Sequence, residues 1–127
     1  MNREEIAVFE KTYAQLIGFY EETVLLVKKN PNDVMNKFKL QLINKVLTIA
    51  NGIVGDTKPF EGFEVFDIEG DMPTNSDVSM VLSQYIKCME LIKKANVHFE
   101  YKYWYWIVDG DRKSTVLRTS APVMLKD

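Results

Sequence analysis

The residue types that most often carry out metal, nucleophilic or acid–base chemistry are scarce in this sequence. His98 is the only histidine and Cys88 the only cysteine among the 127 residues. A zinc site needs three or four suitable ligands, and these two residues cannot supply them. Cys88 lies near an apolar helical stripe that includes Tyr85 and Met89, where a thiol behaves as a small hydrophobic side chain. We therefore predict a fold without metal or organic cofactor and without a nucleophilic cysteine.

An acidic stretch around residues 67–71 suggests calcium binding at first sight. Asp67, Glu69 and Asp71 match the first three ligand positions of an EF-hand loop. The loop also needs glycine at position six and an acid at position twelve, where this sequence has Met72 and Val78. The pattern fails, so we interpret the stretch as a solvated acidic loop. Phosphate-binding glycine loops, nucleophile elbows and redox cysteine pairs are also missing, which argues against an enzyme.

Aromatic residues are concentrated near the C-terminus, and this is the one feature that indicates a binding surface. Six of the fifteen aromatic residues fall between positions 99 and 106. In a strand over residues 97–108 successive side chains point to opposite faces. We expect the odd-numbered face to cover the helices, which leaves Trp104 and Trp106 on the other face. Exposed tryptophans beside lysine or arginine are typical of interaction hot spots.

A turn at Asp109-Gly110-Asp111 should return the chain as a second strand over residues 113–120. If the turn spans residues 109–112, the register pairs Val108 with Lys113, Trp106 with Thr115, and Trp104 with Leu117. The predicted binding face therefore consists of three apolar side chains and a basic rim, namely Trp104, Trp106 and Leu117 with Lys102 and Lys113. The competing interpretation covers both tryptophans with a loop or with the apolar tail, inside the protein's own core.

The spacing of apolar residues along the sequence predicts the helices and strands that position this face. Apolar residues recur at spacings of three and four over residues 3–29, 33–54 and 76–95, which predicts three helices. Residues 55–75 form a long acidic connection that is too apolar to be a free linker, and a short extended piece is expected at residues 64–68. We predict one α+β domain over residues 1–127: a three-helix core, a C-terminal antiparallel hairpin over residues 97–120 and a tail over 121–127.

Charge and composition limit the classes of partner. The net charge is −2, and residues 55–77 alone contribute one basic and seven acidic residues, a local charge of −6. A slightly acidic chain disfavours general nucleic-acid binding, which needs a basic face. One cysteine and no secretory pattern point to the cytoplasm. No apolar run approaches the roughly 20 residues of a membrane helix, so we expect no membrane contact.

These observations favour a non-enzymatic protein-interaction or regulatory module that uses the aromatic hairpin face, most simply as a homodimer. The first alternative is a single-stranded nucleic-acid binder, in which the tryptophans stack on bases. Its phosphate contacts would be Lys102, Arg112, Lys113 and Arg118. An enzyme of unrecognised type is the less favoured third possibility.

Overall fold

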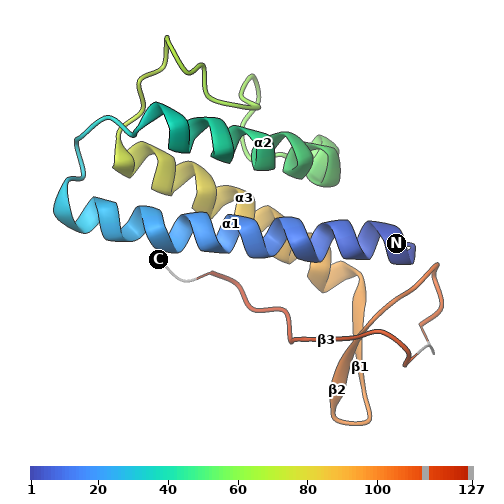
Figure 1. The fold of residues 1–127 in the computed structure, drawn as a ribbon. Helices are drawn as coiled ribbons and strands as arrows, with labels where there is room; N and C mark the ends of the chain where they lie inside the picture. The colour runs from blue at the N-terminus through green and yellow to red at the C-terminus, as the bar shows by residue number, and fades with distance from the viewer. Residues whose placement is uncertain (113–114, 126–127) are drawn as a thin grey trace.

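The computed structural model describes residues 1–112 and 115–125, and it confirms the predicted α+β class. Three helices precede a small antiparallel sheet at the C-terminus (Figure 1). Among the described residues, no helix is both long and apolar enough to cross a bilayer. The elements in chain order are α1 (Arg3–Lys29), α2 (Lys37–Val54), the 3-10 helix η1 (Gly55–Thr57), α3 (Asn75–Ala95), β1 (Val97–Glu100), β2 (Tyr103–Trp106) and β3 (Arg118–Thr119).

Helix α1 forms where the hydrophobic period and the capping residues agree. The Asn2 side chain accepts a hydrogen bond from the Glu5 backbone N–H, and the Glu5 carboxylate accepts one from the Asn2 N–H. This capping box satisfies two backbone donors that a helix N-terminus leaves free. Lys28 and Lys29 occupy the last turn, where cations interact favourably with the helix dipole.

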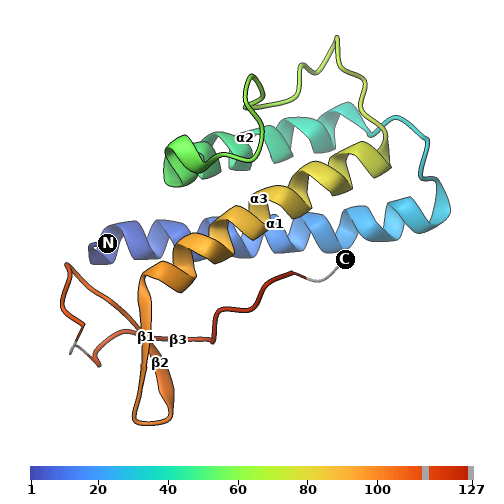
Figure 2. The same cartoon turned by 180° about the vertical axis from the view of Figure 1, so that it is seen from behind.

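Helices α2 and α3 begin at side-chain caps that the sequence placed only approximately. The prediction began α2 at residue 33, whereas the helix begins at Lys37 after the cap residue Asn36. Val34 cannot start the helix because it forms an isolated antiparallel bridge with Thr74, the N-cap of α3. The two helix N-termini are thereby tied together at one end of the molecule, as Figure 2 shows from behind.

The hydrophobic core lies between the three helices and receives one residue from each of β1 and β2. Helices α1 and α3 make the most extensive contact of any helix pair. The largest fully buried side chain is Trp106 of β2, followed by Tyr85 of α3 and Phe9 of α1. The sheet is therefore anchored to the helices through its last β2 residue.

The connection between α2 and α3 packs against both helices. The Asn44 amide bonds both the N–H and the carbonyl of Phe66, at 3.0 and 2.8 Å, and Asn51 donates to the Glu64 carbonyl. Phe66 is buried and its ring meets that of Phe63 at 5.1 Å. The packed loop was expected, but residues 64–68 form no strand. The third strand of the sheet comes instead from β3.

The predicted single strand over residues 97–108 is wrong. The chain reverses at Tyr101–Lys102, so β1 and β2 are the two arms of a short antiparallel hairpin. The turn at Asp109–Gly110 does occur, with positive φ at both residues and a bridge between Val108 and Asp111. It does not join two long strands, because residues 115–117 are not in a strand and pairing resumes only at β3.

Candidate functional site

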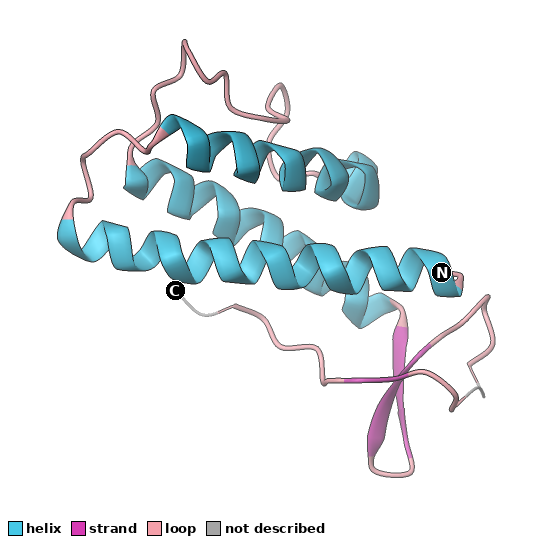
Figure 3. Cartoon of the chain, in the orientation of Figure 1, coloured by secondary structure: helices cyan, strands magenta, loops and turns pink. Residues whose placement is uncertain are grey.

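The hairpin formed by β1 and β2 projects away from the helical bundle at the C-terminal end of α3 (Figure 3). Glu100 pairs with Tyr103, which leaves Tyr101 and Lys102 as the two central residues of the turn. Their φ angles are 51° and 74°. Positive φ at both positions is what a type I′ turn requires, and asparagine followed by glycine is its usual sequence. Here two residues with large side chains adopt that strained conformation.

Aromatic side chains at the end of this hairpin remain in contact with solvent. Phe99 is 60% exposed, Tyr101 75% and Tyr103 47%. The Phe99 ring lies 5.5 Å from the half-buried Trp104 ring across the strand pair. On the opposite face the Arg118 guanidinium lies 4.1 Å from the Tyr103 ring centre, a distance typical of a cation–π contact. The cross-strand pairs order these rings without burying them.

Trp106 has a structural role that differs from the predicted exposed position. It is fully buried, and its ring meets Phe9 of α1 edge-on with 5.3 Å between centres. Its indole N–H donates to the Glu10 carboxylate at 2.7 Å. The hairpin reversal pairs Trp106 with the buried Val97, so this side of the strand pair faces the helices at its base. Of the odd-numbered aromatic residues, which were expected to cover the helices, Phe99, Tyr101 and Tyr103 are exposed and Tyr105 is half-buried.

The remaining predicted site residues are dispersed. The predicted register is wrong, because Trp104 pairs with Thr119 and not with Leu117. Leu117 is half-buried, and its carbonyl accepts from the Trp106 backbone N–H at 2.8 Å. Lys102 is exposed in the hairpin turn, next to the aromatic rings. Lys113 lies outside the described residues. The structure thus brings Lys102 and Trp104 to the projecting hairpin and separates them from Trp106 and Leu117.

A polar cluster connects the base of the sheet to α1 and α3. It borders a cavity of about 340 Å³ that is lined by residues of α1, α3 and the segment 118–120. The Glu10 carboxylate accepts from the Thr119 hydroxyl as well as from Trp106. On the other side, the Lys93 ammonium donates to the Ser120 hydroxyl at 2.9 Å. These contacts hold the chain after β3 against the α1–α3 pair.

Burial shifts the pKa values of two groups in this cluster, downward for Lys93 and upward for Tyr13, and both shifts favour the uncharged form. Desolvation lowers the pKa of Lys93, an effect that the nearby Glu10 and Glu90 oppose. Desolvation also raises the pKa of Tyr13, whose hydroxyl donates to the Glu90 carboxylate at 2.7 Å. The second Glu90 oxygen accepts from the Leu125 backbone N–H. Since each partner belongs to α1, α3 or the C-terminal segment, the cluster ties these three parts together.

The residues considered for chemistry have structural partners. His98 lies 3.7 Å from the Glu100 carboxylate and packs on the Tyr105 ring. Burial raises the pKa of the Cys88 thiol, which donates to the Thr57 carbonyl. In the acidic loop, Asp67 and Asp71 accept hydrogen bonds from the loop's own backbone. Within residues 1–112 and 115–125, no group of three or more His, Cys, Asp or Glu residues is arranged to hold a metal ion.

Comparison with known proteins finds no match to this chain among protein-family models, curated proteins or solved structures. The candidate site therefore rests on its geometry. Of the features above, sequence reasoning missed the chain reversal, which brings Trp106 to the buried side of the strand pair and leaves Phe99, Tyr101 and Tyr103 exposed. The missing signal was the turn at Tyr101–Lys102, which has no glycine, asparagine or proline to mark it.

Proposed function

We propose that this protein is a non-enzymatic interaction module that binds a protein partner through its hairpin tip, defined as residues 99–104. The observation that carries the proposal is the exposure of Phe99, Tyr101 and Tyr103 on a hairpin that leaves the bundle. Such rings present large contact areas at low cost in conformational entropy. With Lys102 between them, the tip has the aromatic and cationic composition of interaction hot spots.

The conformation of the turn supports a role for its side chains beyond folding. Tyr101 and Lys102 adopt positive φ, which costs roughly 1–3 kcal/mol for each residue other than glycine. Asparagine and glycine would form this turn with less strain. Positions where a sequence departs from local conformational preferences without a gain in stability tend to be functional. The Tyr101 and Lys102 side chains therefore fit a contact role better than a folding role.

The edge of the sheet supplies the mode of binding. The strand order is β1-β2-β3, so one edge of β1 has no strand beside it in the described part of the chain. The backbone N–H and C=O groups of such an edge can pair with an added strand. We therefore propose an extended segment of the partner beside β1, with apolar side chains that contact Phe99 and Trp104.

The nucleic-acid alternative has weaker support than a protein partner. Trp106 is fully buried and has no free face on which a base could stack. Arg118 already lies over the Tyr103 ring. Among the described cations of that set, Lys102 in the hairpin turn and the exposed Arg112 remain as phosphate contacts, which is few charges for a backbone-driven association. An oligonucleotide affinity that falls steeply with salt is the result that would favour this alternative.

Site-specific photo-crosslinking inside the cells that naturally produce this protein tests the proposal. A photoreactive phenylalanine analogue replaces Tyr101 in one variant and Leu91 in the control. Leu91 is an exposed apolar side chain on α3, so it is accessible to solvent like Tyr101 but lies outside the hairpin tip. We expect one discrete protein adduct from position 101 and none from position 91. Equal adducts from both positions, or none from position 101, would contradict the proposal.

A further inference from the structure

The three helices form three seams, and chain segments cover two of them. The connection between α2 and α3 covers the α2–α3 seam, through bonds from Asn44 and Asn51 and through the Cys88–Thr57 contact. The segment from β3 to Leu125 covers the α1–α3 seam through the polar cluster. In the part of the chain that the structure describes, neither segment crosses the α1–α2 seam, as Figure 1 shows.

Large apolar side chains remain exposed along the α1–α2 seam. Val8 and Leu25 on α1 are 47% and 60% exposed, and Phe38 and Ile49 on α2 are 66% and 46% exposed. The helices are antiparallel, so Leu25 and Phe38 lie at one end and Val8 and Ile49 at the other. Single exposed apolar residues are ordinary, but several on one face of a helix pair indicate an interaction surface.

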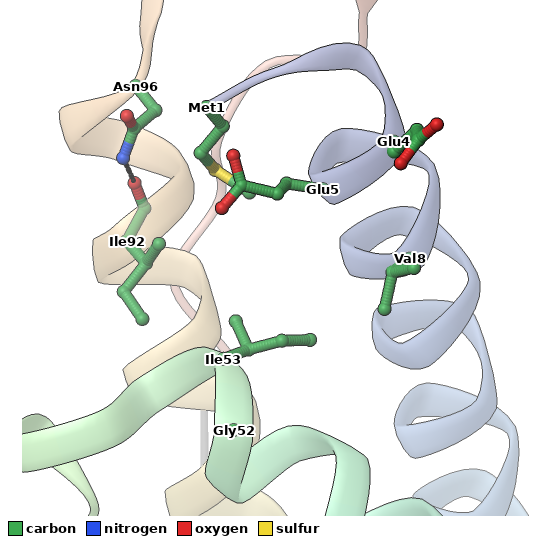
Figure 4. A pocket seen from close by; sticks show the side chains of 8 residues that line it. All are labelled: Met1, Glu4, Glu5, Val8, Gly52, Ile53, Ile92 and Asn96. Atoms are coloured by element: carbon green, nitrogen blue, oxygen red, sulfur yellow. Dashed lines mark hydrogen bonds between the residues drawn. The ribbon is translucent and has the colours of Figure 1, made fainter.

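The seam is hollow at both ends. One hollow of about 440 Å³ lies between Val8 of α1, Ile53 of α2 and Ile92 of α3 (Figure 4). The other, of about 460 Å³, is lined by residues of α1 and α2 that include Leu25 and Phe38. The surface therefore offers both projecting side chains and spaces that side chains of a second surface could fill.

We propose that the α1–α2 face binds the same face of a second copy of this chain, so that two helix pairs form a four-helix bundle. The charges of the two helices favour this occupant. The charged side chains that line the two hollows are Glu4, Glu5 and Glu22 from α1 and Lys39 from α2, and α2 contains no acidic residue. A two-fold axis parallel to the helices places each α1 over the partner's α2, which brings opposite charges together. A perpendicular axis places α2 over α2 and brings like charges together.

The two-fold axis parallel to the helices also brings equivalent ends of the two α1–α2 seams together. It keeps every residue at its own height along the bundle, so the partner's Phe38 lies over Leu25 and the hollow beside it. At the same height, Glu22 of α1 meets the partner's Lys39, and both side chains line that hollow. The contact is self-complementary, as a two-fold interface requires. Both hairpins then project from the same end of the dimer.

The mass in solution, measured by light scattering after size exclusion, tests this dimer. At about 100 µM, well above a micromolar Kd, we expect twice the chain mass for the unchanged protein. Phe38→Lys should give the mass of one chain with an unchanged far-ultraviolet circular dichroism spectrum. Leu91→Lys is the matched control, since Leu91 is 56% exposed on α3 outside the seam, and it should stay dimeric. A monomeric unchanged protein, or a dimer that tolerates Phe38→Lys, would overturn the proposal.

Charge exchange tests the orientation. Glu22→Lys and Lys39→Glu should each weaken the dimer at least tenfold, and the two together should restore it because the pair across the axis is reversed. Failure of the double variant to restore the dimer would refute the parallel axis. Tyr101→Ser in the hairpin tip should leave the mass unchanged. The dimer and the proposed hairpin contact are therefore tested separately.

Discussion

Replacing Trp106 by alanine is the perturbation whose effect is best defined by the structure. The side chain is fully buried, packs edge-on against Phe9 and donates a hydrogen bond to Glu10. Replacing a buried tryptophan by alanine costs about 3–5 kcal/mol. The hydrogen bond to a carboxylate adds about 1 kcal/mol, since Glu10 is exposed and water can replace the indole N–H. The expected loss, about 4–6 kcal/mol, is a large part of the roughly 5–15 kcal/mol that stabilises a domain.

Trp104→Ala is the matched comparison, since both tryptophans belong to β2. Trp104 is half-buried and its ring packs against that of the exposed Phe99. We expect a loss of about 1–2 kcal/mol, the range for a partly buried cross-strand aromatic pair. Trp106→Phe separates packing from hydrogen bonding, because it keeps an aromatic ring beside Phe9 and removes the indole donor. The loss of stability caused by Trp106→Phe should lie between the losses caused by Trp104→Ala and Trp106→Ala.

Urea unfolding followed by far-ultraviolet circular dichroism measures these differences without relying on tryptophan fluorescence. Each variant is compared with the unchanged protein at the same concentration, which matters if the chain associates. Equal losses for Trp104→Ala and Trp106→Ala would refute the assignment of Trp106 to the core and Trp104 to the hairpin tip. A Trp106→Ala loss below about 2 kcal/mol, small for a fully buried ring, would refute it as well.

Three further predictions follow from named contacts. Tyr13→Phe should make stability less dependent on pH above about 10, because the raised pKa of Tyr13 gives a contribution that is present below that pH and lost as the hydroxyl ionises; alkaline unfolding curves measure this. Asn44→Ala should cost about 1–3 kcal/mol by leaving two backbone groups unpaired, and should speed proteolysis of the α2–α3 connection. Tyr101→Asn with Lys102→Gly should raise stability by about 1 kcal/mol or more, seen as a higher urea midpoint.

The helices could be predicted from the sequence because each buries one face along its whole length. The period of three and four in residues 3–29 fixes which side of α1 is apolar, and the core positions Ile6, Phe9 and Leu16 follow that stripe. The turn at Asp109–Gly110 was also predictable, since these residues adopt positive φ at little cost. In these segments the local preferences and the tertiary fold agree.

The hairpin could not be predicted in the same way, because its turn has no sequence signal. Tyr101 and Lys102 read as the middle of a strand, and a continuous strand puts Phe99 inside and Trp106 outside. The reversal brings Trp106 to the same side of the strand pair as Val97 and Phe99, so Trp106 is buried at the base of the hairpin, whereas Phe99 on that side lies farther out and is exposed. The burial of Trp106 also depends on Phe9 and Glu10, which are more than 90 positions away in the sequence. Periodicity gives the alternation of faces, but only tertiary packing decides which face is buried.

The α1–α2 seam shows a second limit of sequence reasoning. The sequence predicts a wide apolar arc on residues 33–54 but does not say which seam the long connection and the tail will cover. That choice depends on side chains such as Asn44 and Lys93, whose partners are loop residues. The surface left open is therefore a property of the tertiary fold.

The claim that the hairpin tip binds a protein partner is tested most directly by changing the turn and measuring how strongly a neighbouring position crosslinks to the partner. A photoreactive analogue at position 99 reports crosslinking in two backgrounds, the unchanged turn and Tyr101→Asn with Lys102→Gly. If the tip side chains make the contact, the crosslinked yield falls about tenfold or more in the second background, as for loss of a hot spot, although that variant is the more stable protein. An unchanged yield in the stabilised variant would contradict the account.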